Sequence, residues 1–399
     1  MEAEIFDLVV AGGRLANGAA VDLGIASGTI TTIVPAGTLS EEPRVELDGA
    51  LILPGLIDGH IHLDKTLLGL PWIPHVPGAS VRERLQAEKA LRRSLPKPMV
   101  ARARRLVELV VTRGTLALRS HVDIDQEIKL AHLEALLRLR EEMKEVIDIQ
   151  LVAFPQSGVT SVAGAAYLLD AALAAGADLL GGLDPAGIDG DIEGQLDILF
   201  RLAAKHGVGL DIHLHDPGEL GAYELRRIAE RTRASGLGGK VAVSHAFALG
   251  AISDAAFGAT ADALASADVA IMTNGPGAEP RPPVTRLAAA GVTVFAGSDN
   301  IRDAWSPYGN GDMLERARHI GYLNGLKTDA ELEFALDLVT GNAARVLAFG
   351  DCRLVEGGRA DLIAVAAANA AEAVAASPPR QVVIKAGRIV ARNGQIVTY

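Results

Sequence analysis

Short apolar runs alternate with longer amphipathic stretches through most of the chain, from about residue 53 to residue 341. The runs hold roughly four to eight mostly apolar residues, a pattern typical of buried strands, and the longer stretches repeat apolar positions with the period of a helix. Eight such runs in series predict an α/β fold of the (β/α)8 barrel type. A doubly wound open sheet is the alternative, but no GxGxxG motif follows the first run. The runs are LPGLIDGHIHLD, TLALRSHVDID, DIQLVAFPQSG, DLLGGLDPAG, GLDIHLHD, KVAVSHA, DVAIMTN and TVFAGSD.

The two ends of the chain share a pattern that the middle lacks. Both alternate two- or three-residue apolar runs with glycine, as in DLGIASGTITTIVPAG and RQVVIKAGRIVARNGQIVTY. This pattern is typical of short strands joined by tight turns, and the termini of a fold often lie close together. We therefore expect one composite β-domain from residues 1–54 and 350–399, and a barrel domain from residues 55–349.

Composition narrows the class of partner. The 399 residues are 49% hydrophobic but only 4% aromatic, so a large aliphatic core is expected, as in a parallel sheet. The net charge of −11 argues against a nucleic-acid partner and favours a small ligand. One cysteine, Cys352, excludes a CxxC metal site. An acidic N-terminus and the lack of a long uncharged apolar run predict a cytoplasmic protein with no membrane partner.

Polar residues gather where the predicted strands end. His60 and His62 end the first strand and share one face, because side chains at i and i+2 point the same way. His213 ends the fifth strand, His245 the sixth, and Asp299 the eighth. The carboxyl ends of barrel strands meet at one mouth, where catalysis usually takes place, so we expect these side chains to lie together.

Three imidazoles and one carboxylate suit zinc or ferrous iron, with a position left open for water. We expect His60, His62, His213 and Asp299 to bind such an ion, which lowers the pKa of a bound water toward neutrality. Asp299 would take the proton of that water, and His245 would orient it or polarise the group attacked. A lone strand histidine is usually a core residue, so the grouping carries this hypothesis.

Two further strand-end residues are left open at this point. His121, at the end of the second strand, either supports the site from below or acts in it directly. Lys65, just past the two histidines, is expected to be a site residue, with an ordinary solvated lysine as the alternative.

The motifs PGLIDGHIHLD, DIHLHD, SHA and GSDN resemble those of the amidohydrolase superfamily. Within it, the sequence is similar to the cytosine deaminase-like branch, which includes the N-isopropylammelide isopropylaminohydrolase of s-triazine breakdown. The resemblance covers nearly the whole chain, including TGNAARVLAFG and LVEGGRADLIAV. It implies a (β/α)8 barrel and a small β-sandwich formed from both chain ends.

The resemblance also implies roles for individual residues. It gives His60, His62, His213 and Asp299 as metal ligands and His245 as the strand-six histidine. Substrate contacts would come from Gln156 in AFPQSG, from Asn300 after the strand-eight acid, and from Trp305, which would cover the substrate ring. Binuclear members carry a carboxylated lysine at the end of strand four. LLGGLDPAGID has no lysine, so one divalent ion, zinc or iron, is expected.

The sequence departs from the cytosine deaminase pattern after strand five. That pattern is H-x-x-E, with the glutamate protonating a ring nitrogen, whereas here Asp216 takes the glutamate position and His215 is added. Either residue could be the proton donor. Asn300 also replaces an acidic residue that reads a ring N–H in cytosine deaminases. His215 with Lys65 resembles the N-isopropylammelide hydrolase instead, which puts cytosine itself in question but keeps the reaction class.

The favoured hypothesis is a metal-dependent, cytosine deaminase-like hydrolase that removes an exocyclic amine from a small N-heterocycle. An N-alkylammelide-type aminohydrolase acting on s-triazines and a ring-opening cyclic-amide hydrolase are the alternatives. A non-enzymatic scaffold of the same fold is a third class, which the complete ligand set disfavours. The stretch GLPWIPHVPGASVRERLQAEKAL after strand one is expected either to cover the mouth as a lid or to form a rigid surface loop. A homo-oligomer is expected only by analogy with the family.

Overall fold

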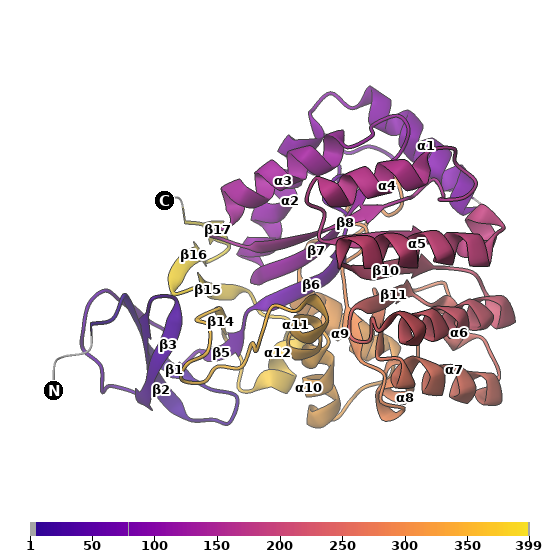
Figure 1. Ribbon diagram of the computed structural model, residues 1–399. Coiled ribbons are helices and arrows are strands. Elements are labelled where there is room, and N and C mark those ends of the chain that lie inside the picture. The colour runs from indigo at the N-terminus through magenta and orange to yellow at the C-terminus, as the bar shows by residue number, and fades with distance from the viewer. Residues whose placement is uncertain (1–4, 79, 398–399) are drawn as a thin grey trace.

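A parallel barrel surrounded by helices and a separate sheet beside it make up the computed structural model, which describes residues 5–78 and 80–397 (Figure 1). The predicted fold class is confirmed. The chain enters through the separate sheet, forms the barrel, and returns to the sheet, so both ends lie on the same side of the molecule in Figure 1.

The barrel consists of eight parallel strands that neighbour one another in chain order. Each of the eight apolar runs contributes one strand. The ring closes between the first and last strands, where Ile61 bridges to Asp299 and the Asp299 N–H donates to the carbonyl of His60 at 2.7 Å. The strands are β6 (Leu56–Ile61), β7 (Thr115–Asp123), β8 (Asp148–Phe154), β9 (Leu179–Leu183), β10 (Gly209–Leu214), β11 (Val241–His245), β12 (Val269–Thr273) and β13 (Val294–Ala296).

Helices connect the strands and cover the outside of the barrel. In α5 the Asp191 side chain accepts the N–H of Gly194, Gly207 ends the helix with a φ of 70°, and one face buries apolar residues such as Leu199. The helices are α1 (Val81–Ser94), α2 (Met99–Thr112), α3 (Ala131–Met143), α4 (Ala165–Ala174), α5 (Ile192–His206), α6 (Gly218–Ser235), α7 (Asp254–Ser266), α8 (Val284–Ala289), α9 (Met313–Leu323), α10 (Asp329–Asp337), α11 (Gly341–Leu347) and α12 (Ala370–Ala376), with single turns η1 (Pro185–Asp189) and η2 (Phe247–Gly250). No described helix is long and apolar enough to cross a membrane.

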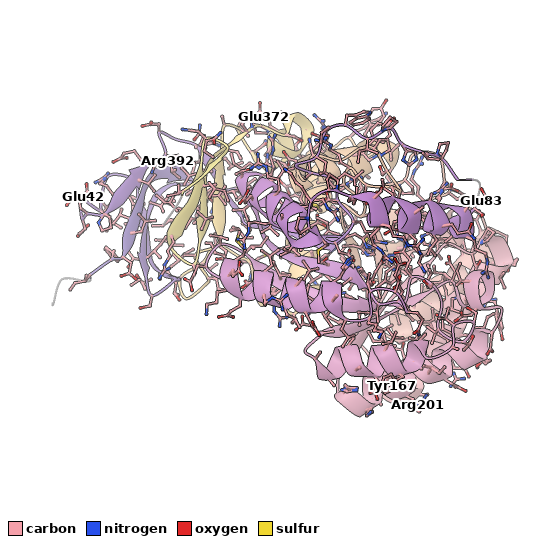
Figure 2. The ribbon with its side chains drawn as sticks, turned by 90° about the horizontal axis from the view of Figure 1, so that it is seen from above. Glu42, Glu83, Tyr167, Arg201, Glu372 and Arg392 are labelled. Atoms are coloured by element: carbon pink, nitrogen blue, oxygen red, sulfur yellow. The ribbon has the colours of Figure 1, made fainter. Side chains whose placement is uncertain are left out.

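The separate sheet draws its nine strands from both ends of the chain. Its strand order is β17-β16-β15-β14-β5-β1-β2-β3, with β4 paired to β1, so hydrogen bonds link the N-terminal and C-terminal strands into one continuous sheet. Glu42 and Arg392 lie at this end of the molecule in Figure 2, and Glu83 of α1 lies at the opposite end. The strands are β1 (Leu8–Arg14), β2 (Ala20–Ala26), β3 (Thr29–Pro35), β4 (Arg44–Glu46), β5 (Leu51–Pro54), β14 (Leu362–Val365), β15 (Arg380–Lys385), β16 (Arg388–Arg392) and β17 (Gln395–Ile396).

The run LPGLID is divided between the two parts of the fold at Gly55. Strand β5 pairs with β14 in the separate sheet, whereas β6 begins the barrel directly after Gly55. A Cβ on Gly55 would lie 2.6 Å from Leu116 Cδ1, so the close approach of β7 requires glycine there. This crossing coincides with the expected domain boundary, although the boundary itself stays a prediction.

An apolar layer closes the end of the barrel opposite the histidines. Ile57, Ala117, Ala242 and Phe295 pack there against buried residues of α11, including Leu347. The predicted metal ligands lie at the other end, at or just beyond the carboxyl ends of the strands.

Candidate metal centre and substrate pocket

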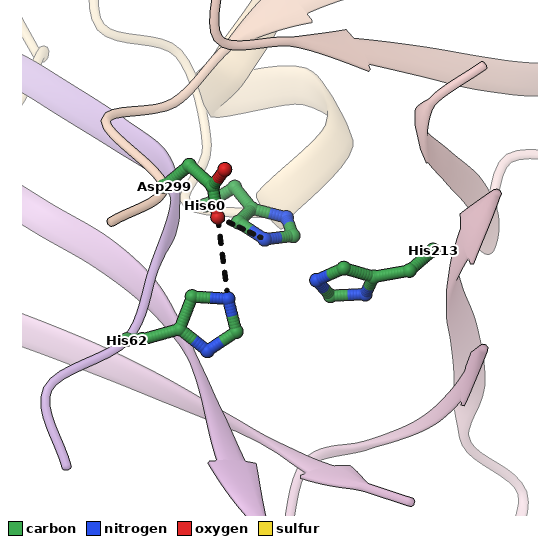
Figure 3. Close-up of side chains that lie close together, drawn as sticks. All are labelled: His60, His62, His213 and Asp299. Atoms are coloured by element: carbon green, nitrogen blue, oxygen red, sulfur yellow. Dashed lines mark ion pairs between the residues drawn. The ribbon is translucent and has the colours of Figure 1, made fainter. Parts of the chain in front are cut away.

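Four predicted metal ligands converge at the mouth of the barrel (Figure 3). His60 belongs to β6, His62 follows β6 directly, His213 belongs to β10, and Asp299 follows β13. One nitrogen or oxygen of each side chain lies within 4.8 Å of the others, and all four residues are buried. Asp299 Oδ1 is 3.6 Å from His60 Nε2 and 3.3 Å from His62 Nε2.

The donor atoms of this group fit a divalent cation. Among the described residues, His60 Nε2 and both ring nitrogens of His213 are buried without a hydrogen-bond partner. Such buried nitrogens are costly unless something binds their lone pairs. Burial and the nearby His121 hold the pKa of His60 well below its usual range, so its imidazole is neutral, as a ligand must be. Against the effect of burial, His245 and the hydrogen bond from His62 lower the pKa of Asp299 and keep it ionised.

A second layer of side chains fixes the orientation of His60. Its Nδ1 lies 2.9 Å from Ser244 Oγ, and the Ser244 hydroxyl donates to Asp211 Oδ1 at 2.7 Å. Because the single Ser244 proton goes to Asp211, Oγ accepts the proton of His60 Nδ1 and leaves Nε2 free to bind. Arg119 holds the other oxygen of Asp211 at 2.8 Å.

Sequence analysis anticipated only His121 of this second layer, either as support for the site or as part of it. The signal for the rest of the layer was present, because Arg119 and Asp211 are charged residues within apolar strands, and Asp211 stands two positions before His213, on the same face. His121 belongs to the same layer. Its ring stacks on that of His60 with centroids 4.0 Å apart, and its Nε2 lies 3.5 Å from Asp211 Oδ1.

His245 and His215 form a stacked pair in the wall of a cavity of about 1080 Å³ that opens at the mouth. Their ring centroids are 4.5 Å apart with an interplanar angle of 24°. Asp299 lines the same cavity, and its Oδ2 accepts a hydrogen bond from Asn274 at 2.8 Å. His245 has a φ of 73°, a conformation that is costly for a side chain of this size and often marks a functional position.

The two residues after His213 lie in different surroundings. His215 faces Asp184, with Nδ1 2.9 Å from Asp184 Oδ2, and this carboxylate raises the pKa of His215 although burial opposes it. Asp216 accepts the N–H of Gly187 and is not among the described residues that line the cavity. Asp184 precedes a proline and suggested only a turn in the sequence, but its burial and its contact with His215 make it part of the site.

Three of the predicted substrate contacts meet at a residue that sequence reasoning missed. Glu88, in α1, accepts hydrogen bonds from Lys65 Nζ at 3.2 Å, from Gln156 Nε2 at 3.0 Å and from the indole N–H of Trp305. Lys65 also pairs with Asp123 at 3.1 Å. Glu88 lies in α1, within the stretch that follows the first barrel strand, and nothing in the neighbouring sequence marks it as a site residue. Helix α1 belongs to the stretch that was expected either as a lid or as a rigid surface loop, and it carries Glu88 into the site. The choice between lid and rigid loop stays a prediction.

The remaining predicted contact, Asn300, lines the cavity beside Trp305. Its Nδ2 donates to Asp303 Oδ2 at 2.7 Å, and Asp303 also accepts the backbone N–H of Trp305 at 2.8 Å. Burial raises the pKa of Asp303 to about 6, and these hydrogen bonds oppose that rise. The loop after β13 is therefore held in shape by one buried carboxyl group.

Known proteins resemble this chain over almost its whole length. Residues 44–397 match the amidohydrolase family. The N-isopropylammelide isopropyl amidohydrolase of Pseudomonas sp. (strain ADP) is 34% identical, with 98% of this chain and 99% of that protein covered. A crystal structure of N-isopropylammelide isopropylaminohydrolase from Burkholderia multivorans ATCC 17616 is 43% identical with a TM-score of 0.94, covering 98% of this chain and 100% of that one. The 5-methylcytosine deaminase of Klebsiella pneumoniae, liganded with 5-fluorocytosine, is 27% identical with a TM-score of 0.87, covering 98% of each chain.

The family match spans most of the chain, and the curated relative is one-third identical from end to end. The buried group of histidines and Asp299 is the kind of site that metal-dependent enzymes of this family require. The protein therefore belongs to the amidohydrolase family, a family of metal-dependent hydrolases of carbon–nitrogen bonds.

Proposed function

We propose that the protein uses one divalent ion, zinc or iron, to remove an exocyclic amine from a small N-heterocycle by hydrolysis. The observation that carries this proposal is the convergence of unpaired, buried imidazole nitrogens and the Asp299 carboxylate beside a cavity. His60, His62, His213 and Asp299 would hold the ion. A divalent ion in such a site supplies a nucleophile at neutral pH by lowering the pKa of water, and it polarises the carbon that is attacked.

Asp299 is the proton carrier in this proposal. Its carboxylate is ionised and held by Asn274, so it is oriented to take the proton of the attacking water and to deliver it to the departing amine. His245, stacked against His215 in the cavity wall, orients the attacking water. Burial and the neighbouring His215 lower the pKa of His245 to about 3, so it acts as a neutral imidazole.

We assign protonation of the ring nitrogen to His215 rather than to Asp216. His215 lines the cavity, and Asp184 favours its imidazolium form. An acid aimed at the ring neutralises the negative charge that develops there as water adds. Asp216 has its own hydrogen bond to Gly187 and lies beside the buried Glu224, which suits a supporting role.

Lys65, Gln156, Asn300 and Trp305 would contact the substrate ring. Among N-heterocycles, an s-triazine that bears an alkylamino group is the favoured substrate. The cavity of about 1080 Å³ continues from His215 and Asp299 to Tyr308 and Tyr322, which leaves room beside the ring for a substituent. The similarity to the Burkholderia aminohydrolase and the combination of Lys65 with His215 support the same class.

The test is turnover of a panel that holds N-alkylammelides, ammelide, cytosine, 5-methylcytosine, pterin and cyclic amides, using protein loaded with zinc or with iron. We expect release of an alkylamine or ammonia and a product in which oxygen replaces the amine nitrogen. A product heavier than its substrate by one water would show ring opening and overturn the proposal. The proposal would also be overturned if the metal-loaded protein released no amine from any compound of the panel.

A further inference from the structure

Glu88 is the one buried carboxylate among the described residues of the stretch after strand one, residues 69–78 and 80–91, and the mechanism above does not use it. Helix α1 carries it inward, while ion pairs anchor the outer face of the same helix. Arg92 pairs with Asp125 at 3.0 Å and with Glu127 at 3.1 Å, and Arg93 pairs with Glu127 at 2.8 Å. The helix is therefore fixed over the barrel with Glu88 on its inner side.

One oxygen atom of Glu88 organises three side chains. Oε2 accepts from Lys65, from Gln156 and from Trp305, and a lysine ammonium and an indole N–H can only donate. The end of the Gln156 amide that faces Glu88 must then be its NH2 group, because an amide oxygen there would be repelled by the carboxylate. Gln156 Oε1 is left buried, with no hydrogen-bond partner in the part of the chain that the structure describes.

Lys65 is organised in the same way. Its ammonium carries three N–H bonds, of which two point to Glu88 and Asp123. Burial disfavours the ammonium, but the carboxylates of Asp123 and Glu88 more than offset that effect and raise the pKa of Lys65, so it stays charged. One N–H donor of Lys65 and one acceptor of Gln156 therefore stand next to the same Glu88 oxygen.

This cluster adjoins the metal ligands. The ring of Phe154 stacks on His213 with centroids 4.2 Å apart, and Lys65 Nζ lies 5.8 Å from the centre of that ring. Trp305 lies on the other side, in the wall of the cavity that holds Asp299, and Lys65 Nζ is 5.6 Å from its ring centre. A heterocycle bound next to the metal ligands and Trp305 would thus have its far edge near Lys65 and Gln156, which are buried and are not among the described residues that line the cavity.

We propose that Glu88 is a positioning residue that sets substrate specificity, because it orients Gln156 and Lys65 to recognise a lactam edge of the ring. The ring C=O accepts from Lys65 Nζ, and the adjacent ring N–H donates to Gln156 Oε1. This inference rests on the proposed function, since it assumes that an N-heterocycle binds beside Asp299. It restricts the substrate class to heterocycles that carry an N–H next to a C=O.

Two variants and one control test the role of Glu88. Glu88→Gln removes the negative charge that holds Gln156 in place, so the side-chain amide of Gln156 can flip and exchange its oxygen and NH2 group. The swapped double variant Glu88→Gln/Gln156→Glu keeps the total charge, gives Lys65 a carboxylate again and keeps an acceptor oxygen at position 156. The control Glu127→Gln weakens the outer anchor of α1, in which Arg92 keeps its pair with Asp125, and it leaves the cluster intact. It therefore reports the effect of loosening the helix alone.

The first readout is binding of s-triazine-2,4,6-trione, a ring made of lactam edges, measured by calorimetry with the zinc-loaded protein. We expect the dissociation constant to rise about tenfold in Glu88→Gln, to return within about threefold of the parent value in the swap, and to stay unchanged in Glu127→Gln. With the panel substrate that is turned over, KM should rise about tenfold in Glu88→Gln while kcat changes less than threefold. Metal content should be equal in all four proteins.

The outcomes separate the two proposals. If the parent protein releases amine but Glu88→Gln binds and turns over like the parent, the role of Glu88 is wrong and the proposed function stands. A swap no better than the single variant also overturns the role of Glu88, as does a parent protein that does not bind the trione. If the parent protein releases no amine while trione binding still depends on Glu88 as described, the proposed function falls and the specificity role survives.

Discussion

Ser244 links His60 to Asp211, accepting from the imidazole Nδ1 at 2.9 Å and donating to the carboxylate at 2.7 Å. This arrangement fixes which nitrogen of His60 carries its proton. Partners of this kind typically raise metal affinity by about 10- to 100-fold, because they hold a ligand in one tautomer and one orientation.

Ser244→Ala should therefore weaken metal binding by about 10-fold or more. The measurement is competition with a chelator of known affinity. The control is Ser266→Ala, which changes an exposed serine on α7. If the Ser244→Ala protein holds its metal as tightly as the parent, the second layer does not set the tautomer of His60.

Removal of the metal should lower the thermal midpoint of the protein. A ligand that binds only the folded state stabilises it by about 4 kcal/mol when present at roughly 1,000 times its dissociation constant. We expect a chelator to lower the midpoint by several degrees and added zinc to restore it. In His213→Ala this response to zinc should disappear, since one of the three imidazoles is gone. A thermal midpoint that stays the same when the chelator is added would contradict metal binding at this site.

Asp184→Asn should move the alkaline limb of the kcat profile to lower pH. His215 acts as an acid only while it is protonated, and Asp184 raises its pKa. Without the carboxylate, His215 loses its proton at a lower pH, and kcat at pH 8 should fall toward the roughly 100- to 10,000-fold loss that removal of a general acid typically causes. Asp216→Asn should move the limb less than Asp184→Asn does, because the charge of Asp216 raises the pKa of His215 to a smaller extent. If Asp216→Asn moves the limb and Asp184→Asn does not, Asp216 is the proton donor.

Glu224 in α6 should make the protein less stable as the pH rises. Burial, and then the nearby Asp216, raise its pKa to about 8, so the folded state keeps a proton that the unfolded chain loses near pH 4.5. The folded state thus binds more protons between these values, and the free energy of unfolding falls as the pH rises from about 5 to 8. The carboxyl oxygen Oε1 accepts the N–H of Ala186 at 2.9 Å, a bond that glutamine can keep.

Glu224→Gln mimics the protonated form, so the drop in thermal midpoint between pH 5.5 and pH 8 should be smaller than in the parent. Glu230→Gln, on the exposed side of the same helix, is the matched control and should behave like the parent. Equal drops in all three proteins would show that Glu224 is already ionised at neutral pH.

The barrel, and the convergence of the candidate metal ligands at its mouth, could be predicted from the sequence because both follow from local patterns. An apolar run marks a strand, and a polar residue at its carboxyl end marks the mouth, as His60, His213 and Asp299 illustrate. Glu88 could not be predicted in this way. It lies on a helix outside the barrel, and only the path of the stretch after strand one decides which residue of that helix turns inward. Asp184 was missed for a different reason, since an aspartate before a proline is common in turns.

The choice between His215 and Asp216 as the proposed proton donor also required the three-dimensional structure. Adjacent residues point in different directions, and the sequence does not say which one faces the cavity. The structure places Asp184 on one side and Glu224 on the other, and these neighbours give the two side chains different chemistry.

The apolar layer of Ile57, Phe295 and Leu347 closes the barrel at one end, so among the described residues the site opens only where the strands end. The proposed reaction has two products, an amine and a ring, and both would leave by the opening through which the next substrate arrives. A ring product that keeps its lactam edge still matches Lys65 and Gln156 after the amine has gone. Under the proposed function, accumulated ring product should therefore compete directly with fresh substrate for the same end of the barrel.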